Sequence, residues 1–214
     1  DETLDLLAQG DYVAERSLAT ALYLSLKLNR PLFLEGEAGV GKTEIAKVLS
    51  NTLGRRLVRL QCYEGLDVSS AVYEWNYARQ MIEIRLAEAT GDRSRESLGG
   101  DIFSPEFLIK RPLLQALESS IEGPPVLLID EIDKADIEFP NDLLQELDRM
   151  EFHVYETGQT VRAAHRPVVV ITSNNEKELP DAFLRRCFFH YIRFPDADTL
   201  RAIVDVHYPG LKRG

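Results

Sequence analysis

The sequence predicts an α/β fold in which a parallel β-sheet is covered by helices on both faces. Short apolar segments recur along the chain, and segments with helical spacing of apolar residues alternate with them. The predicted strands are Pro31–Leu34, Leu57–Leu60, Val126–Ile129 and Val168–Thr172. Strands without a polar face are typical of a parallel sheet that is buried on both sides. Their alternation with helices favours an open α/β sheet over a sandwich or a bundle.

The remaining elements follow from apolar spacing and from turn residues. Helices are predicted over Tyr12–Leu28, Thr43–Leu53, Asp67–Thr90, Arg111–Ile121, Phe139–Met150 and Leu179–Leu184. Apolar and charged residues alternate over Ile82–Leu86, so a strand is also possible there. A hairpin is predicted over Phe152–Ala163 and a last strand over Tyr191–Phe194, and Gly91–Gly100 is expected to form a loop.

Composition restricts the class of protein. The chain has 214 residues, 44% hydrophobic and 28% charged, which is enough apolar material for one domain, or one domain and a fragment. The net charge of −10 argues against a surface that coats nucleic acid. Cys62 and Cys187 lie far apart, which favours a reducing compartment. The acidic N-terminus is unlike a signal peptide, and no apolar run could span a membrane, so we expect a cytoplasmic protein.

A phosphate-binding motif follows the first predicted strand. Its eight residues fit GxxxxGK[ST], a loop whose backbone N–H groups and following helix N-terminus surround phosphate oxygens. Lys42 would contact the β- and γ-phosphates, and the Thr43 hydroxyl would bind Mg²⁺. A glycine turn with an incidental lysine is the simpler alternative, but the strand before and the helix after favour ATP binding. The candidate binding residues are Gly36, Glu37, Ala38, Gly39, Val40, Gly41, Lys42, Thr43 and Glu44.

Two acids follow the strand Val126–Ile129 directly. Ligands of open α/β sheets bind at the carboxyl ends of the strands, so these acids should face the phosphates. Asp130 would hold Mg²⁺, and Glu131 would orient and deprotonate the attacking water. The alternative is that both acids only favour the start of the next helix through its dipole.

Three further polar residues are candidates for catalysis. Asn174 follows the strand Val168–Thr172, where its amide could hydrogen-bond the γ-phosphate and the water, although it could instead bond its own backbone. Arg185 and Arg186 end a short predicted helix. Either arginine could reach the nucleotide of a neighbouring subunit as an arginine finger, and Arg186 is preferred. A solvated basic pair is the alternative.

The ordered segments GEAGVGKT, LLIDEID, ITSN and LPDAFLRRC resemble the AAA+ ATPases over nearly the whole chain. The segment RLQCYEGLD and the hairpin FHVYETGQTV resemble the MoxR branch, which has an insert in helix 2 and a hairpin before sensor 1. The run CYEGLD…YEWNYARQ is similar to MoxR-type proteins that help carbon monoxide dehydrogenase to mature.

This resemblance implies the large subdomain of an AAA+ P-loop NTPase over residues 1–195, with residues 196–214 as the start of a lid or a linker and the helical lid largely absent. It implies ATP hydrolysis with Mg²⁺ at the subunit interfaces of a ring, usually a hexamer. It also implies a client protein, such as a metalloenzyme or a von Willebrand-type adaptor. By position, Val13 falls where the family contacts adenine.

Two other functions remain open at the level of sequence. The chain could be a nucleotide-dependent switch that binds ATP with little turnover, although the presence of both Glu131 and Asn174 favours hydrolysis. It could also be a DNA-acting AAA+ ATPase, because a fold does not fix a function. The net charge of −10 makes binding to nucleic acid the less favoured of the two.

Overall fold

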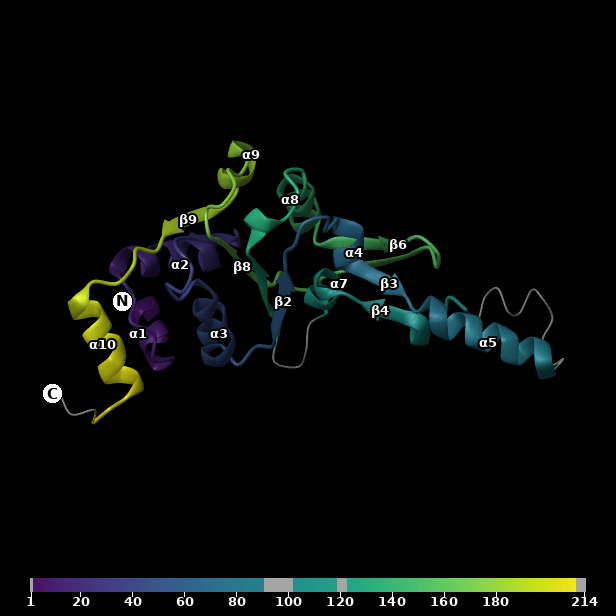
Figure 1. Cartoon of the computed structure of the whole chain (residues 1–214), viewed down its shortest axis with the longest axis horizontal. Coiled ribbons are helices and arrows are strands. Elements are labelled where there is room, and N and C mark those ends of the chain that lie inside the picture. Colours follow the sequence, from purple (N-terminus) through teal and green to yellow (C-terminus); the bar gives the residue numbers. More distant parts are fainter. Residues whose placement is uncertain (1, 91–101, 119–122, 211–214) are drawn as a thin grey trace.

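The structure is a computed structural model that describes residues 2–90, 102–118 and 123–210. Within these ranges five parallel strands form the central sheet in the order β2-β5-β8-β1-β9. Their bounds are Leu57–Gln61 for β2, Val126–Asp130 for β5, Val168–Ser173 for β8, Leu32–Glu35 for β1 and Phe188–Tyr191 for β9. The α/β fold with a parallel sheet is therefore confirmed (Figure 1).

Helices cover both faces of this sheet, as the apolar strands predicted. Leu32 and Leu34 of β1 pack in one apolar cluster, while Phe33 packs in the other. The first cluster is covered by α1 (Glu2–Gln9), α2 (Arg16–Leu28) and α3 (Lys42–Thr52). The second is covered by α4 (Val68–Val72), α7 (Pro112–Leu117), α8 (Phe139–Arg149) and α9 (Asp181–Leu184).

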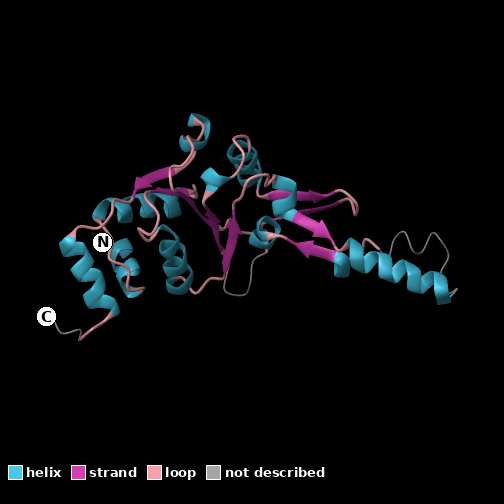
Figure 2. Ribbon diagram, in the orientation of Figure 1, coloured by secondary structure: helices cyan, strands magenta, loops and turns pink. Residues whose placement is uncertain are grey.

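An arm extends from the second face of the sheet. The antiparallel pair β3 (Tyr73–Trp75) and β4 (Leu108–Lys110) lies beside the hairpin β6 (Glu151–Val154) and β7 (Gln159–Arg162), and α5 (Tyr77–Thr90) continues outward from it (Figures 1 and 2). Trp75, Phe107 and Val154 form a small apolar cluster that joins the two strand pairs. The predicted hairpin is confirmed, whereas β4 and the 3₁₀ helix Pro105–Phe107 were not predicted.

The helix predicted over Asp67–Thr90 is wrong in its middle. Asp67 caps the short helix α4, since its carboxylate accepts a hydrogen bond from the Ser70 N–H group at 2.6 Å. The chain then forms β3, because antiparallel pairing with β4 provides hydrogen-bond partners for its backbone N–H and C=O groups. This pairing outweighs the helical spacing of its apolar residues. A helix resumes at Tyr77, so Ile82–Leu86 is helical and the strand alternative is wrong. The predicted loop over Gly91–Gly100 lies outside the described residues.

Two boundaries also differ from the prediction. The helix predicted from Tyr12 begins at Arg16, because α1 ends in a turn with Asp11 in the left-handed region (φ 58°). The last strand is Phe188–Tyr191 rather than Tyr191–Phe194, because this register pairs Phe188 with Leu32 of β1.

Other boundaries agree within a few residues. The helix predicted over Arg111–Ile121 ends earlier, at Leu117 of α7, because Glu118 is extended (φ −85°, ψ 109°); residues 119–122 lie outside the description. After β9 the chain forms α10 (Ala197–His207), which lies at the end of the molecule opposite α5 (Figure 1). In the described part of the chain, none of the helices combines the length and the apolar character needed to cross a bilayer.

Candidate nucleotide-binding site

The glycine loop joins the carboxyl end of β1 to the first turn of α3, as predicted. Gly41 directly precedes α3 and has φ 91°, a left-handed conformation that glycine adopts without strain. Gly36 lies against the chain that follows β9, where a Cβ atom would come within 2.4 Å of the Ile192 carbonyl oxygen. Both glycines are therefore required by the path of the loop.

Lys42 points into this loop. Its side chain is buried, and its Nζ donates hydrogen bonds to the carbonyl oxygens of Gly36 at 2.7 Å and Glu37 at 2.6 Å. Burial lowers the pKa of Lys42, while the nearby carboxylates of Asp133 and Asp130 act in the opposite direction. The structure thus holds one cationic group inside the curve of the loop.

Asp130 ends β5 next to the first turn of α3. Its Oδ1 accepts hydrogen bonds from the Thr43 hydroxyl at 3.1 Å and from the Thr172 hydroxyl at 2.6 Å. Its Oδ2 accepts from the guanidinium of Arg59 on β2, with Nε at 3.0 Å. Because the Asp130 side chain is almost fully buried, these partners fix its orientation.

Glu131 follows in a left-handed backbone conformation, with φ 57° and ψ 53°. Such strain in a non-glycine residue is typical of functional sites, and here the Glu131 N–H group is held by the Thr172 hydroxyl at 2.9 Å. The carboxylate accepts from Asn174 Nδ2 at 3.3 Å. Hydrogen bonding to Lys134, at 2.8 Å, is the main cause that lowers the pKa of Glu131, so the group stays ionised at neutral pH.

One cavity collects these groups. It has a volume of about 270 Å³, and its walls come from the glycine loop, the start of α3 and the ends of β5 and β8. Its lining residues are Ala38, Gly39, Gly41, Lys42, Thr43, Glu44, Asp130, Glu131, Thr172 and Asn174. Segments that are far apart in the sequence thus meet at the carboxyl edge of the sheet, where an α/β fold binds its ligands.

A family model, described as the AAA domain of the dynein-related subfamily, matches residues 31–187, which is more than half of the chain. The chain belongs to this AAA family. The fold also matches the crystal structure of a candidate ATPase from Cytophaga hutchinsonii with a TM-score of 0.63 and 15% sequence identity. The match covers 99% of this chain and 56% of that one, so the chain spans little more than half of that protein's length. At this identity the likeness shows the fold alone.

The pair Asp130 and Thr43 of this AAA domain fits Mg²⁺. A hydroxyl and a carboxylate oxygen lie 3.1 Å apart at the mouth of the glycine loop, and hard oxygen donors are the ligands that Mg²⁺ prefers. Magnesium is usually held by one or two protein groups together with substrate phosphates. Among the described residues, no group of three or more His, Cys, Asp or Glu side chains could hold a metal ion.

Several predicted residues of the AAA domain lie outside the cavity. Gly36, Glu37 and Val40 do not line it, although the first two bind Lys42 through their carbonyl groups. Val13 lies in the link between α1 and α2 rather than in a helix, with 38% of its surface exposed. A place beside adenine remains a prediction for Val13.

Arg185 and Arg186 lie near the amino ends of the parallel strands, whereas the glycine loop lies at their carboxyl ends. They precede β9, which pairs with β1 along its whole length, so the two sites are separated by roughly 13 Å of strand. A larger cavity of about 1000 Å³ opens at this edge. The basic residues that line it are Arg30, Arg55, His165, Arg166, Arg185 and Arg186. Neither arginine lines the cavity at the glycine loop.

A second set of residues holds the site residues of the AAA domain; of these, the sequence indicated only Asp133, as a structural residue. Thr172 and Lys134 contact Asp130 and Glu131, respectively, and Asp133 accepts from the Asn174 N–H group at 3.1 Å. Arg59 and Gln61 contact the same two acids from β2. Polar residues at alternate positions of an otherwise apolar strand, as in Leu57–Gln61, are the signal that could have indicated the last pair.

Substitution of Gly36 by alanine tests the path of the loop. The new Cβ would meet the Ile192 carbonyl, so we expect the free energy of unfolding to fall by about 2–3 kcal/mol. Gly158→Ala is the control, because Gly158 has a left-handed φ of 68° but no neighbour within 4 Å, and should cost only about 1 kcal/mol. Urea unfolding measures both. Equal losses would contradict the described contact with Ile192.

Proposed function

We propose that this AAA domain hydrolyses ATP to ADP and phosphate in a Mg²⁺-dependent reaction. The observation that carries the proposal is the convergence of Lys42, Thr43, Asp130, Glu131 and Asn174 on one cavity. A switch that only binds nucleotide would need the loop and the lysine. Hydrolysis also requires a proton acceptor for the attacking water and a group that orients it, and the ionised Glu131 beside the Asn174 amide would provide both.

The chain's own groups have separable roles in this reaction. The N–H groups at the start of α3 and the Lys42 ammonium would bind the β- and γ-phosphates. Glu131 would accept the proton of the attacking water as its oxygen bonds to the γ-phosphorus and the bond to ADP breaks. Asn174, already hydrogen-bonded to Glu131, would orient that water. Thr43 and Asp130 would hold Mg²⁺, which neutralises charge on the phosphate oxygens when bound.

Release of phosphate from ATP by the purified chain tests this proposal. We expect turnover with Mg²⁺ and background release in EDTA. Tight ATP binding without release would support a nucleotide-dependent switch instead. Absence of both binding and release would contradict a nucleotide site at this cavity.

We further infer that hydrolysis occurs between subunits of a ring. The support is the position of Arg185 and Arg186, which lie near the amino ends of the strands, opposite the glycine loop of the same chain. In a head-to-tail assembly this basic edge would face the phosphates of the next copy. The cluster of arginines is suited to this contact, because a planar guanidinium binds phosphate oxygens with two hydrogen bonds.

Arg186→Ala tests the contact between subunits. It should lower ATP turnover roughly 1,000-fold while ATP affinity changes little, because the residue would stabilise only the transition state of a neighbour. Mixing Arg186→Ala with Lys42→Ala subunits should restore part of the turnover, since one variant supplies an intact cavity and the other an intact arginine. The finger assignment would be contradicted if mixing restored no turnover and if Arg185→Ala hydrolysed ATP at the wild-type rate.

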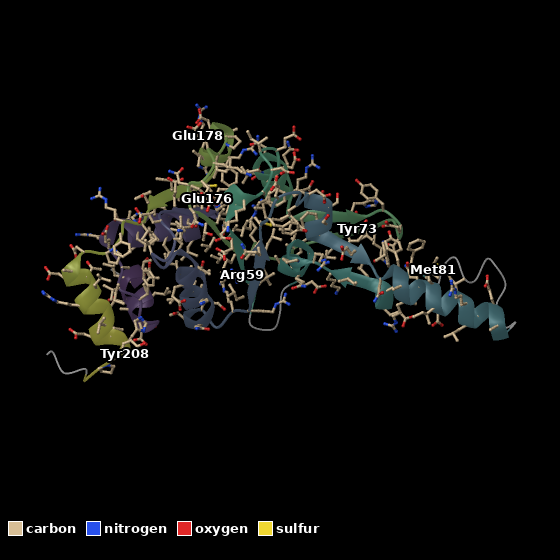
Figure 3. The ribbon with its side chains drawn as sticks, viewed as in Figure 1. Arg59, Tyr73, Met81, Glu176, Glu178 and Tyr208 are labelled. Atoms are coloured by element: carbon tan, nitrogen blue, oxygen red, sulfur yellow. The ribbon has the colours of Figure 1, made fainter. Side chains whose placement is uncertain are left out.

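The arm is the proposed contact for a client protein. Four large apolar side chains of α5 are at least half exposed, and Tyr155, in the turn between β6 and β7, is 81% exposed. The four are Tyr77, Met81, Ile82 and Leu86, of which Met81 is labelled in Figure 3. Exposed apolar groups of this kind mark protein contacts. Together with the resemblance to the MoxR branch, they support remodelling or activation of a client, with a maturing metalloenzyme as the favoured class.

A further inference from the structure

Two polar side chains of β2 reach the acids at the end of β5. Arg59 and Gln61 occupy alternate positions, so they share one face of the strand. The register places Gln61 opposite Asp130, and Figure 3 shows Arg59 extending from the middle of the molecule near β2. No other strand of the described sheet places a guanidinium on either acid.

The Arg59 guanidinium pairs with the carboxylate that is expected to hold the metal. Its Nε lies 3.0 Å and a terminal nitrogen 2.5 Å from Asp130 Oδ2. The other oxygen of Asp130 is occupied by two threonine hydroxyls. Among the described residues, Arg59 is thus the cation that contacts Asp130 directly. About half of its side chain is exposed, with 53% accessible against 4% for Asp130, so Arg59 can move into solvent while Asp130 stays fixed.

The same guanidinium is linked to Glu131 through one amide. A terminal nitrogen of Arg59 donates to Gln61 Oε1 at 2.6 Å, and Gln61 Nε2 donates to Glu131 Oε2 at 2.8 Å. An amide that accepts from one group and donates to the next transmits a change in orientation. Displacement of Arg59 would therefore alter how Glu131 is held.

We propose that Arg59 is a counter-ion that competes with Mg²⁺ for Asp130 and, through Gln61, couples metal binding to the orientation of Glu131. The inference rests on the proposed Mg²⁺–nucleotide site. Without the cation, Arg59 neutralises the buried carboxylate. When the cation binds, repulsion between two positive groups displaces Arg59, and Gln61 loses its donor. Arg59 is a positioning residue that sets the metal requirement of the domain.

Binding of Mn²⁺ tests this proposal without any turnover. Mn²⁺ is titrated into the whole chain with saturating ADP and followed by its electron paramagnetic resonance signal. Arg59→Gln should lower the Mn²⁺ concentration at half-saturation about tenfold, because one positive charge near a divalent ion is removed. Arg59→Lys keeps the charge and should stay within about twofold of the wild type. Arg59→Ala removes the same charge, should shift the midpoint in the same direction, and replaces Arg59→Gln if that variant folds poorly.

The matched control is Arg162→Gln. Arg162 pairs with Glu151 through the same two kinds of nitrogen, at 2.8 and 2.5 Å, but lies in the hairpin away from the cavity. Its removal should leave the Mn²⁺ midpoint unchanged. An unchanged or higher midpoint in Arg59→Gln would overturn the proposal, since a residue that only orients Asp130 would weaken metal binding when lost. Failure of the wild type to bind Mn²⁺ with ADP would overturn the proposed function as well.

Discussion

Replacement of Glu131 by glutamine should lower ATP turnover roughly 10²- to 10⁴-fold while leaving ATP affinity nearly unchanged. Glutamine keeps the size of the side chain and its bonds to Gln61 and Lys134 can be partly retained, but an amide cannot accept the proton of the attacking water. The wild-type carboxylate is ionised at neutral pH, and hydrogen bonding to Lys134 lowers its pKa further. Single-turnover phosphate release and nucleotide titration measure the two quantities separately.

A carboxylate outside the cavity provides the control for this substitution. Glu178 lies beyond Asn174, near α9, and does not line the cavity (Figure 3). Glu178→Gln should hydrolyse ATP at the wild-type rate. If Glu131→Gln also turns over normally, another group takes the proton and the role given to Glu131 is wrong.

Replacement of Lys42 by alanine should weaken Mg²⁺–ATP binding roughly 100-fold, or about 3 kcal/mol. The substitution removes a buried ammonium group inside the glycine loop, where it donates hydrogen bonds to the carbonyl oxygens of Gly36 and Glu37. A charge-assisted hydrogen bond to phosphate is worth this amount only in such a desolvated place. Isothermal titration with a slowly hydrolysed ATP analogue measures the change.

Lys47→Ala is the matched control on the same helix. Lys47 is exposed and pairs with Glu44 at 2.9 Å, an interaction of little energetic weight at the surface. Its loss should change ATP affinity by less than about threefold. Equal effects of Lys42→Ala and Lys47→Ala would mean that the loop is a structural turn and that the nucleotide binds elsewhere.

Much of the fold could be predicted because its central strands are apolar on both sides. Val126–Ile129 and Val168–Thr172 leave no polar face, so burial between two helical layers is their stable arrangement. The glycine loop and the acids at the end of β5 could be predicted from local sequence, since each stands at a strand end. The parallel sheet then brings them together at one edge.

Features that depend on distant partners could not be predicted. Trp75 has helical spacing with its neighbours, yet it lies in β3 because β4 and the hairpin complete its surroundings. The last strand begins at Phe188 rather than at the predicted Tyr191, because Phe188 pairs with Leu32 of β1. Likewise the alternation of polar residues in β2 marks Arg59 and Gln61, but they become site residues through the pairing of β2 with β5, which that alternation does not specify.

A crystal structure of the chain with ADP and Mg²⁺ is the most direct test of the site. We predict that the phosphates lie against the N–H groups of Gly39–Thr43, in the cavity that Asp130, Glu131 and Asn174 share. The protein also offers the larger basic cavity lined by Arg166 and Arg186 at the other edge of the sheet. Phosphates bound within a single chain at that edge, with the glycine loop unchanged, would contradict the assigned nucleotide site.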